Sequence, residues 1–158
     1  MTSEAIQKYK LRITEANKTE LIVILYEMSM DYAKDAIRAH GENDRALFRK
    51  EIKRVRGCLL ELMDSLHLEH ELAKNYLKIY SYINRELAMA DGGNTAEPLE
   101  EIIGIISQLH EAYREVSKQD SSLPVMANTQ SVYAGLTYGK NNLNENLMDH
   151  TTNRGFLV

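Results

Sequence analysis

The stretch FRKEIKRVRGCLLELMDSL, residues 48–66, decides the fold. Its apolar side chains recur in alternating steps of four and three residues: Phe48, Ile52, Val55, Leu59, Leu62 and Leu66. This spacing places them along one side of an α-helix, as in the seam of a helical bundle. We therefore expect a helix over residues 44–66 that buries this side against other helices.

The segment before this stretch has the same helical period. Asn17 and Glu20 have the spacing of a capping box, and Gly41 suits a helix end, so a helix is expected over residues 17–41. Its apolar residues form two adjacent stripes, which implies more than one neighbour or a partner. The stripes are Leu21, Leu25, Met28, Tyr32 and Ala36, and Ile22, Tyr26, Met30, Ala33 and Ile37.

Two more helices are expected after residue 66. The sequence Asp91-Gly92-Gly93-Asn94 separates a helix over 69–90 from one that opens at Pro98 and continues through Val116. Their inward side chains are Leu72, Tyr76, Ile79, Ile83, Leu87 and Ala90, and Leu99, Ile102, Ile106, Leu109, Tyr113 and Val116.

Four helices with short connections indicate an all-α fold, an antiparallel up-and-down four-helix bundle. The bundle domain is expected over residues 1–118, with residues 1–16 as a short polar leader. Residues 119–158 are rich in Asn and are expected to form a flexible polar tail with at most a short helix near 143–149. Alternatively, scattered apolar residues let part of this tail dock onto a groove of the bundle. These residues are Val132, Tyr133, Leu136, Tyr138, Leu143 and Leu147.

Composition limits the compartment and the partners. The net charge of −4 gives no general case for nucleic-acid binding. The single cysteine, Cys58, excludes an intrachain disulfide and favours a reducing compartment. The charged N-terminus does not resemble a secretory signal, and the aliphatic runs are far shorter than the roughly 20 residues that cross a bilayer. A cytoplasmic protein without membrane insertion is expected.

No motif indicates catalysis, so the chain is expected not to be an enzyme and to need no cofactor. Cys58 has no neighbouring base that would activate it. His67 and His70, with Asp64 nearby, form the only cluster that resembles a metal site, and it lacks the second Glu-x-x-His copy of a di-iron bundle. We therefore expect no metal, with solvated turn residues as the interpretation of this cluster.

Residues 45–56 hold six basic residues and one acidic residue. Ion pairing with acidic neighbouring helices, or a solvated face, explains this charge. Docking of an acidic partner is the alternative.

Tyrosine is abundant, with 9 residues, and several lie on the first and third expected helices. Some of them can be ordinary boundary residues, but tyrosine is also favoured at recognition surfaces. Together with the double stripe, they predict a groove that holds an apolar peptide. Its expected lining is Ile22, Tyr26, Met30, Tyr76, Tyr80 and Ile83.

Several segments together resemble the flagellin export chaperone family, FliS. NKTELIVILYE (17–27) resembles the start of the first long helix of that family, and LLEL (59–62) the end of the second. AKNYLKIYSYI (73–83) with LAMA (87–90) resembles the third, and LEEI (99–102) with LHEAY (109–113) the fourth. The resemblance covers about residues 5–118. It departs at His70-Glu71, where the family often has Gly-Gly, and at Tyr113, where Trp is common.

This resemblance implies a cytoplasmic four-helix chaperone that binds the C-terminal region of flagellin, prevents premature polymerisation and delivers it to the flagellar type III export apparatus. It also implies that the N-terminal segment covers part of the groove and contacts the export gate, here through Ile6, Tyr9, Leu11 and Ile13. Other flagellar regulators are further expected partners, and no ATP site is expected. The alternatives are a regulatory or adaptor bundle and a metal-binding, ferritin-like bundle.

Overall fold

The computed structural model describes residues 1–126, and these residues form five α-helices and no strand. The helices are α1 (Ser3–Glu15), α2 (Lys18–Gly41), α3 (Arg45–Asp64), α4 (Glu71–Gly93) and α5 (Leu99–Gln119). The all-α class is confirmed for this part of the chain. The expected number of four helices is wrong, because the predicted polar leader is itself helical.

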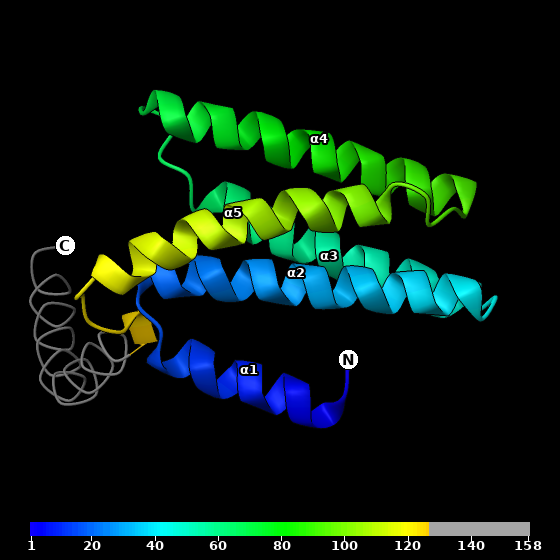
Figure 1. Ribbon diagram of the computed structural model, residues 1–158, viewed down its shortest axis with the longest axis horizontal. Helices are drawn as coiled ribbons and strands as arrows, with labels where there is room; N and C mark the ends of the chain where they lie inside the picture. The colour runs from blue at the N-terminus through cyan, green and yellow to red at the C-terminus, as the bar shows by residue number, and fades with distance from the viewer. Residues whose placement is uncertain (127–158) are drawn as a thin grey trace, which may run out of the picture.

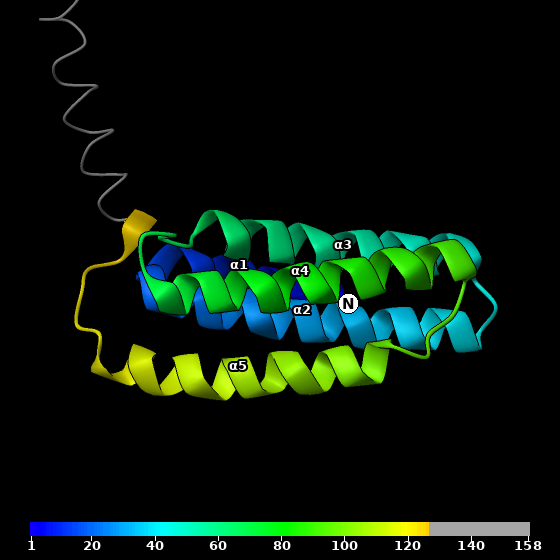
Figure 2. The ribbon, with the colours of Figure 1, turned by 90° about the horizontal axis from the view of Figure 1, so that it is seen from above.

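Helix α2 is the central element of the fold. It packs along both α3 and α5, whereas α4 packs mainly on α3 and has few contacts with α5. Consecutive helices from α2 to α5 run in opposite directions, and α1 lies along α2 on the side away from α4 (Figures 1 and 2). The four long helices thus leave α4 and α5 apart, unlike neighbours in a closed four-helix bundle.

The seam predicted in residues 48–66 forms the centre of the core. Phe48, Ile52, Val55, Leu59 and Leu62 are all buried on α3. They face the small residues Ala33, Ala36 and Ala39 of α2, which belong to the same core. Small side chains let two helix backbones approach closely, which explains why α2 and α3 form the most extensive contact of the fold.

Two predicted inward residues are exposed instead. Leu72 and Val116 are 65% and 51% exposed, respectively. Leu72 lies in the first turn of α4 and Val116 in the last turns of α5, where the helices reach beyond the shared core. Periodicity assigns a side to each residue of a helix, but it does not show where the neighbouring helix ends.

The helix ends follow local polar chemistry. The capping box at Asn17 and Glu20 is present, with Asn17 Oδ1 accepting from the Glu20 N–H at 2.9 Å and Glu20 Oε2 accepting from the Asn17 N–H at 3.0 Å. The left-handed residues after α2 and α4 are Asn43 and Asn94, with φ of 57° and 49°. Gly41 is the last residue of α2 and Gly93 the last residue of α4, so both helices end where the sequence predicts a break, and the asparagines that follow take the turn conformation.

Residues after α5 return to the junction of α1 and α2. The Asn17 side-chain amide donates to the Asp120 and Ser122 carbonyls at 3.3 and 3.4 Å, and the Val125 N–H donates to the Ala16 carbonyl at 3.0 Å. The first residues of the predicted tail are therefore fixed to the helical body. The remainder of that tail, including the short helix expected near 143–149, lies outside the described residues.

We expect Asn17→Ala to lower the free energy of unfolding by about 1–2 kcal/mol, because the buried side chain caps α2 and also binds the returning segment. Urea denaturation followed by circular dichroism measures this. Thr2→Ala, at the exposed cap of α1, is the matched control and should change the global free energy of unfolding little. Equal effects of the two variants would contradict the role given to Asn17.

Candidate partner-binding surface

Four tyrosines fill the space between α2, α4 and α5. Tyr26 of α2 contacts Tyr80 and Tyr113 with ring centroids 6.4 and 5.8 Å apart. Tyr76 of α4 contacts Tyr80 and Tyr113 at 6.1 and 5.7 Å. Because α4 and α5 have few direct contacts, these large rings connect the two helices.

The hydroxyl groups of Tyr26 and Tyr80 hydrogen-bond to each other in the buried core. Burial raises the pKa of Tyr80 to about 12 and raises the pKa of Tyr26 further still. Both phenols are therefore neutral near neutral pH, and each satisfies the polar group of the other.

The six residues predicted to line a groove separate into two groups. Tyr26, Tyr80 and Ile83 are buried in the core and have almost no exposed surface. Ile22, Met30 and Tyr76 are half-buried and pack at the edge of the core. Other side chains of the core cover the first group in this conformation, and the hydrogen bond between the two tyrosine hydroxyls lets both be buried.

An open pocket of about 670 Å³, here called the apolar pocket, lies where α2 and α4 begin and α3 and α5 end. Ile22 and Tyr76 both line it, so the structure brings together these two predicted residues from different helices. The other apolar lining residues are Leu21, Leu25, Leu66, Leu72, Ala73, Tyr113 and Val125. Polar side chains, among them Lys18, Glu61, Asp64, His67 and His70, also line the pocket.

Several lining residues of the apolar pocket were missing from the predicted site. Leu21 and Leu25 belong to the first stripe of α2, and Leu66 and Leu72 stand at the ends of the predicted seams of α3 and α4. The signal that could have identified them is this position: an apolar stripe that extends past the end of its neighbour leaves surface uncovered.

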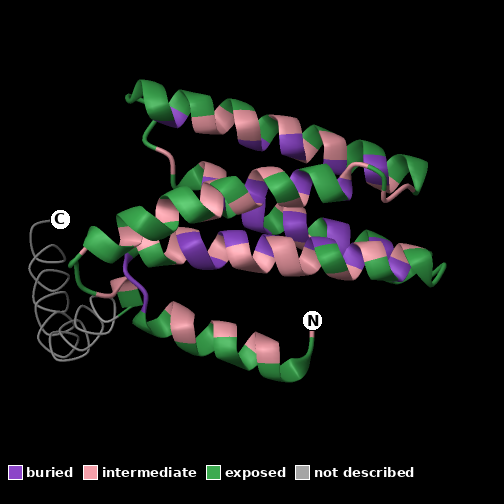
Figure 3. Cartoon of the chain, viewed as in Figure 1, coloured by how far each residue is buried: buried purple, intermediate pink, exposed green. Residues whose placement is uncertain are grey.

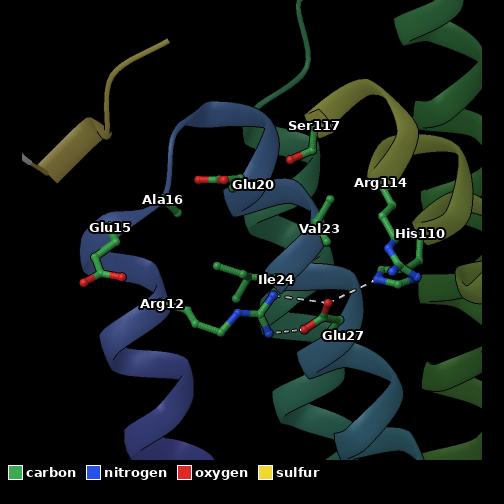
Figure 4. A pocket seen from close by; sticks show the side chains of 10 residues that line it. All are labelled: Arg12, Glu15, Ala16, Glu20, Val23, Ile24, Glu27, His110, Arg114 and Ser117. Carbon is green, nitrogen blue, oxygen red and sulfur yellow. Dashed lines mark hydrogen bonds and ion pairs between the residues drawn. The ribbon is translucent and has the colours of Figure 1, made fainter. Parts of the chain in front are cut away.

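Helix α1 covers a different face of α2. A second cavity, of about 720 Å³, lies between α1, α2 and α5, with Val23 and Ile24 of α2 in its lining (Figure 4). Both of these residues are buried, although neither belongs to a predicted stripe. No residue of α1 is among those that line the apolar pocket.

Polar contacts attach α1 to α2. Tyr9 donates to Asp31 Oδ2 at 2.8 Å, and Arg12 forms an ion pair with Glu27. Glu27 also contacts His110 Nε2 of α5 at 3.2 Å (Figure 4). Burial opposes ionisation of Glu27, but the hydrogen bonds from Arg12 and His110 outweigh it and lower the pKa of this carboxyl below its ordinary value. Helix α1 itself has no buried residue (Figure 3).

The residues predicted to cover a groove lie on this helix. Ile6, Tyr9 and Ile13 are half-buried, whereas Leu11 is 61% exposed. Three of the four therefore face the body of the protein, and Leu11 is available to another molecule while α1 is in place.

The basic segment of α3 is partly paired within the chain. Arg49 Nε lies 3.0 Å from Asp91 Oδ1, Arg54 Nη1 lies 2.7 Å from Glu51 Oε1, and Arg56 Nε donates to Asn84 Oδ1 at 2.8 Å. These contacts agree with the interpretation of residues 45–56 as a solvated, ion-paired face. Docking of an acidic partner there stays an untested prediction.

The histidine cluster does not assemble a metal site within the part of the chain that the structure describes. His67 and His70 are exposed and lie 3.8 and 4.0 Å from the same Glu69 carboxylate oxygen. Across residues 1–126, no three side chains among His, Cys, Asp and Glu gather as metal ligands would.

Burial raises the pKa of the Cys58 thiol, which makes it a poor nucleophile.

An open apolar groove on a helical body is one of the recurring ways in which proteins bind an amphipathic helix of another polypeptide. The family described as Flagellar protein FliS matches residues 1–120. The chain therefore belongs to the FliS family, which consists of flagellar export chaperones and not of enzymes. No curated protein matches the chain, and no helix within residues 1–126 is long and apolar enough to cross a bilayer.

We expect Tyr26→Phe and Tyr80→Phe each to cost about 1–3 kcal/mol of unfolding free energy, because each leaves one buried hydroxyl without its partner. The double variant removes both hydroxyls, so it should be no less stable than either single variant. Chemical denaturation of all four proteins gives this double-mutant cycle. Losses that simply add would show that the two hydroxyls do not depend on each other.

We expect Arg12→Gln to speed amide hydrogen exchange in residues 3–15 and to leave exchange in α2 to α5 unchanged, because α1 is attached through few contacts. Hydrogen-exchange mass spectrometry measures this. Lys8→Gln, an exposed position on the same helix, is the control. If both variants gave the same exchange, the Arg12–Glu27 ion pair would have no role in holding α1.

Proposed function

We propose that the chain binds the C-terminal region of flagellin in the cytoplasm, prevents its premature polymerisation and delivers it to the flagellar type III export apparatus. Membership of the flagellar export chaperone family supports the general activity. The observation that carries the specific proposal is the apolar pocket, which remains open between the ends of four helices.

In this proposal the apolar pocket receives one face of an amphipathic flagellin segment. Leu21, Ile22, Leu25 and Leu72 supply aliphatic surface, and Tyr76 supplies a ring at its inner side. Removing such surface from water contributes roughly 25 cal/mol per Å² of apolar area. Binding alone holds the segment, so release requires competition or displacement and not ATP hydrolysis.

The roles proposed for the predicted groove residues follow from their placement. Ile22 and Tyr76 contact the bound segment directly. Tyr26, Tyr80 and Ile83 support the pocket from the core, and they set the separation of α2 and α4. Met30 does not line the pocket. It lies more than one helical turn after Leu25, the last α2 residue of the pocket lining, and packs against the core.

Helix α1 is proposed to be a detachable cover over a second binding surface. Helix α1 has no fully buried residue, and water can replace its partly buried ion pair and hydrogen bond when it detaches. Its departure would uncover Val23 and Ile24, which would then bind a further part of a long flagellin segment. The released Ile6, Tyr9, Leu11 and Ile13 would be free to contact the export gate.

We expect a flagellin C-terminal peptide to bind the full chain in a 1:1 complex with a negative heat-capacity change, as measured by isothermal titration calorimetry. Leu72→Glu should raise the Kd at least about tenfold, because losing a leucine contact of about 1.4 kcal/mol is sufficient for that factor. Leu72 is already 65% exposed, so the variant should fold normally.

Met89→Glu is the matched control for this experiment. Met89 lies on the same helix and is 68% exposed, but it does not line the apolar pocket. It should leave the Kd unchanged. Equal loss of affinity in both variants would refute the proposed site. No binding of the peptide to the unaltered chain would refute the proposed function.

A further inference from the structure

The chain after α5 is directed to the apolar pocket by a set of specific contacts. Thr19 donates to Asp120 Oδ2 at 2.7 Å, and Asn17 holds the Asp120 and Ser122 carbonyls. The Val125 N–H then bonds the Ala16 carbonyl, and the Val125 side chain lines the apolar pocket. A polar turn therefore ends with an apolar residue at the pocket that we assign to the partner.

The sequence that continues from this point suits an apolar site. No Asp, Glu, Lys or Arg occurs in residues 121–139, although charged residues make up 27% of the chain. Within this uncharged run, Val132, Tyr133, Leu136 and Tyr138 supply large apolar side chains. A segment without charge enters an apolar site without the cost of removing ions from water.

The connection is long enough for these residues to reach the pocket of their own chain. Six residues lie between Val125 and Val132, and an extended chain spans roughly 3.3 Å per residue. Because the connection starts at the pocket itself, it needs only to fold back. A covalently linked segment also has an effective concentration in the millimolar range at short linker lengths, which favours it over a free competitor at lower concentration.

We propose that residues 132–138 occupy the apolar pocket of the same chain when no partner is bound, and that a partner must displace them. The occupancy itself does not depend on the identity of the partner. The competition rests on the proposed function, since it takes the flagellin segment as the displacing molecule. The apparent Kd for the partner would then equal the intrinsic Kd divided by the fraction of chains in which the pocket is empty.

A tryptophan reporter tests the occupancy, because the chain contains no Trp. In the full chain carrying Tyr133→Trp, the introduced indole should emit at shorter wavelength than in water and resist acrylamide quenching. Adding Leu72→Glu should return both properties to those of an exposed indole, whereas adding Met89→Glu should not. Solvent-like emission in the reporter chain, or equal effects of the two added variants, would overturn the inference.

Protein concentration distinguishes this occupant from a second copy of the chain. Emission that is independent of concentration supports occupancy within one chain. A shift that grows with concentration would show exchange between copies and would overturn the inference as stated.

Calorimetry with the flagellin peptide tests the competition. Leu136→Asp in the full chain should lower the Kd several-fold, because the pocket is then free, and Leu147→Asp, outside the segment, should not change it. Binding of the peptide with the same Kd in all three chains would overturn the competition and leave the proposed function intact. If the indole of the reporter chain is shielded but the flagellin peptide does not bind to any of the chains, the proposed function alone is refuted.

Discussion

The hydrogen bond between the Tyr26 and Tyr80 hydroxyls joins α2 and α4 in the buried core. Helices α2 and α3 approach closely over alanine, but α4 and α5 have few direct contacts, so tyrosine rings occupy the space between them. Aromatic rings fill this width only if their polar ends are satisfied, and the two hydroxyls meet that condition together. At the end where the tyrosines stop, the separation of the helices remains and forms the apolar pocket.

The attachment of α1 depends on a different kind of interaction. The core is formed by buried apolar side chains, whereas α1 has no buried residue and is connected through Tyr9 and Arg12. These polar contacts are partly buried, and together with the ion pair between the Met1 amino group and Asp35 they hold the N-terminal segment against α2. Two surfaces of different character therefore lie on α2: one open and apolar, the other covered by α1.

The sequence predicts the fold far better than it predicts the site. The seam from Phe48 to Leu62 and the capping box at Asn17 were readable, because periodicity and capping are local properties. Helix α1 is not predicted from the sequence, because its apolar residues are few and are separated by polar residues. The sequence does not show whether Tyr26 and Tyr80 lie in the core or line a groove, because the hydrogen bond that lets both hydroxyls be buried joins two different helices. The pocket depends on where four helices end relative to each other, which no single segment encodes.

Nuclear magnetic resonance can map directly where a flagellin segment contacts the chain. The isotope-labelled full chain is titrated with a flagellin C-terminal peptide, and methyl and amide shifts are followed. If the apolar pocket receives the segment, the largest changes occur at its lining residues Leu21, Ile22, Leu25, Leu72 and Tyr76. Changes confined to the basic face of α3, at residues such as Arg45, Lys50 and Lys53, with none in the pocket, would contradict the proposed site.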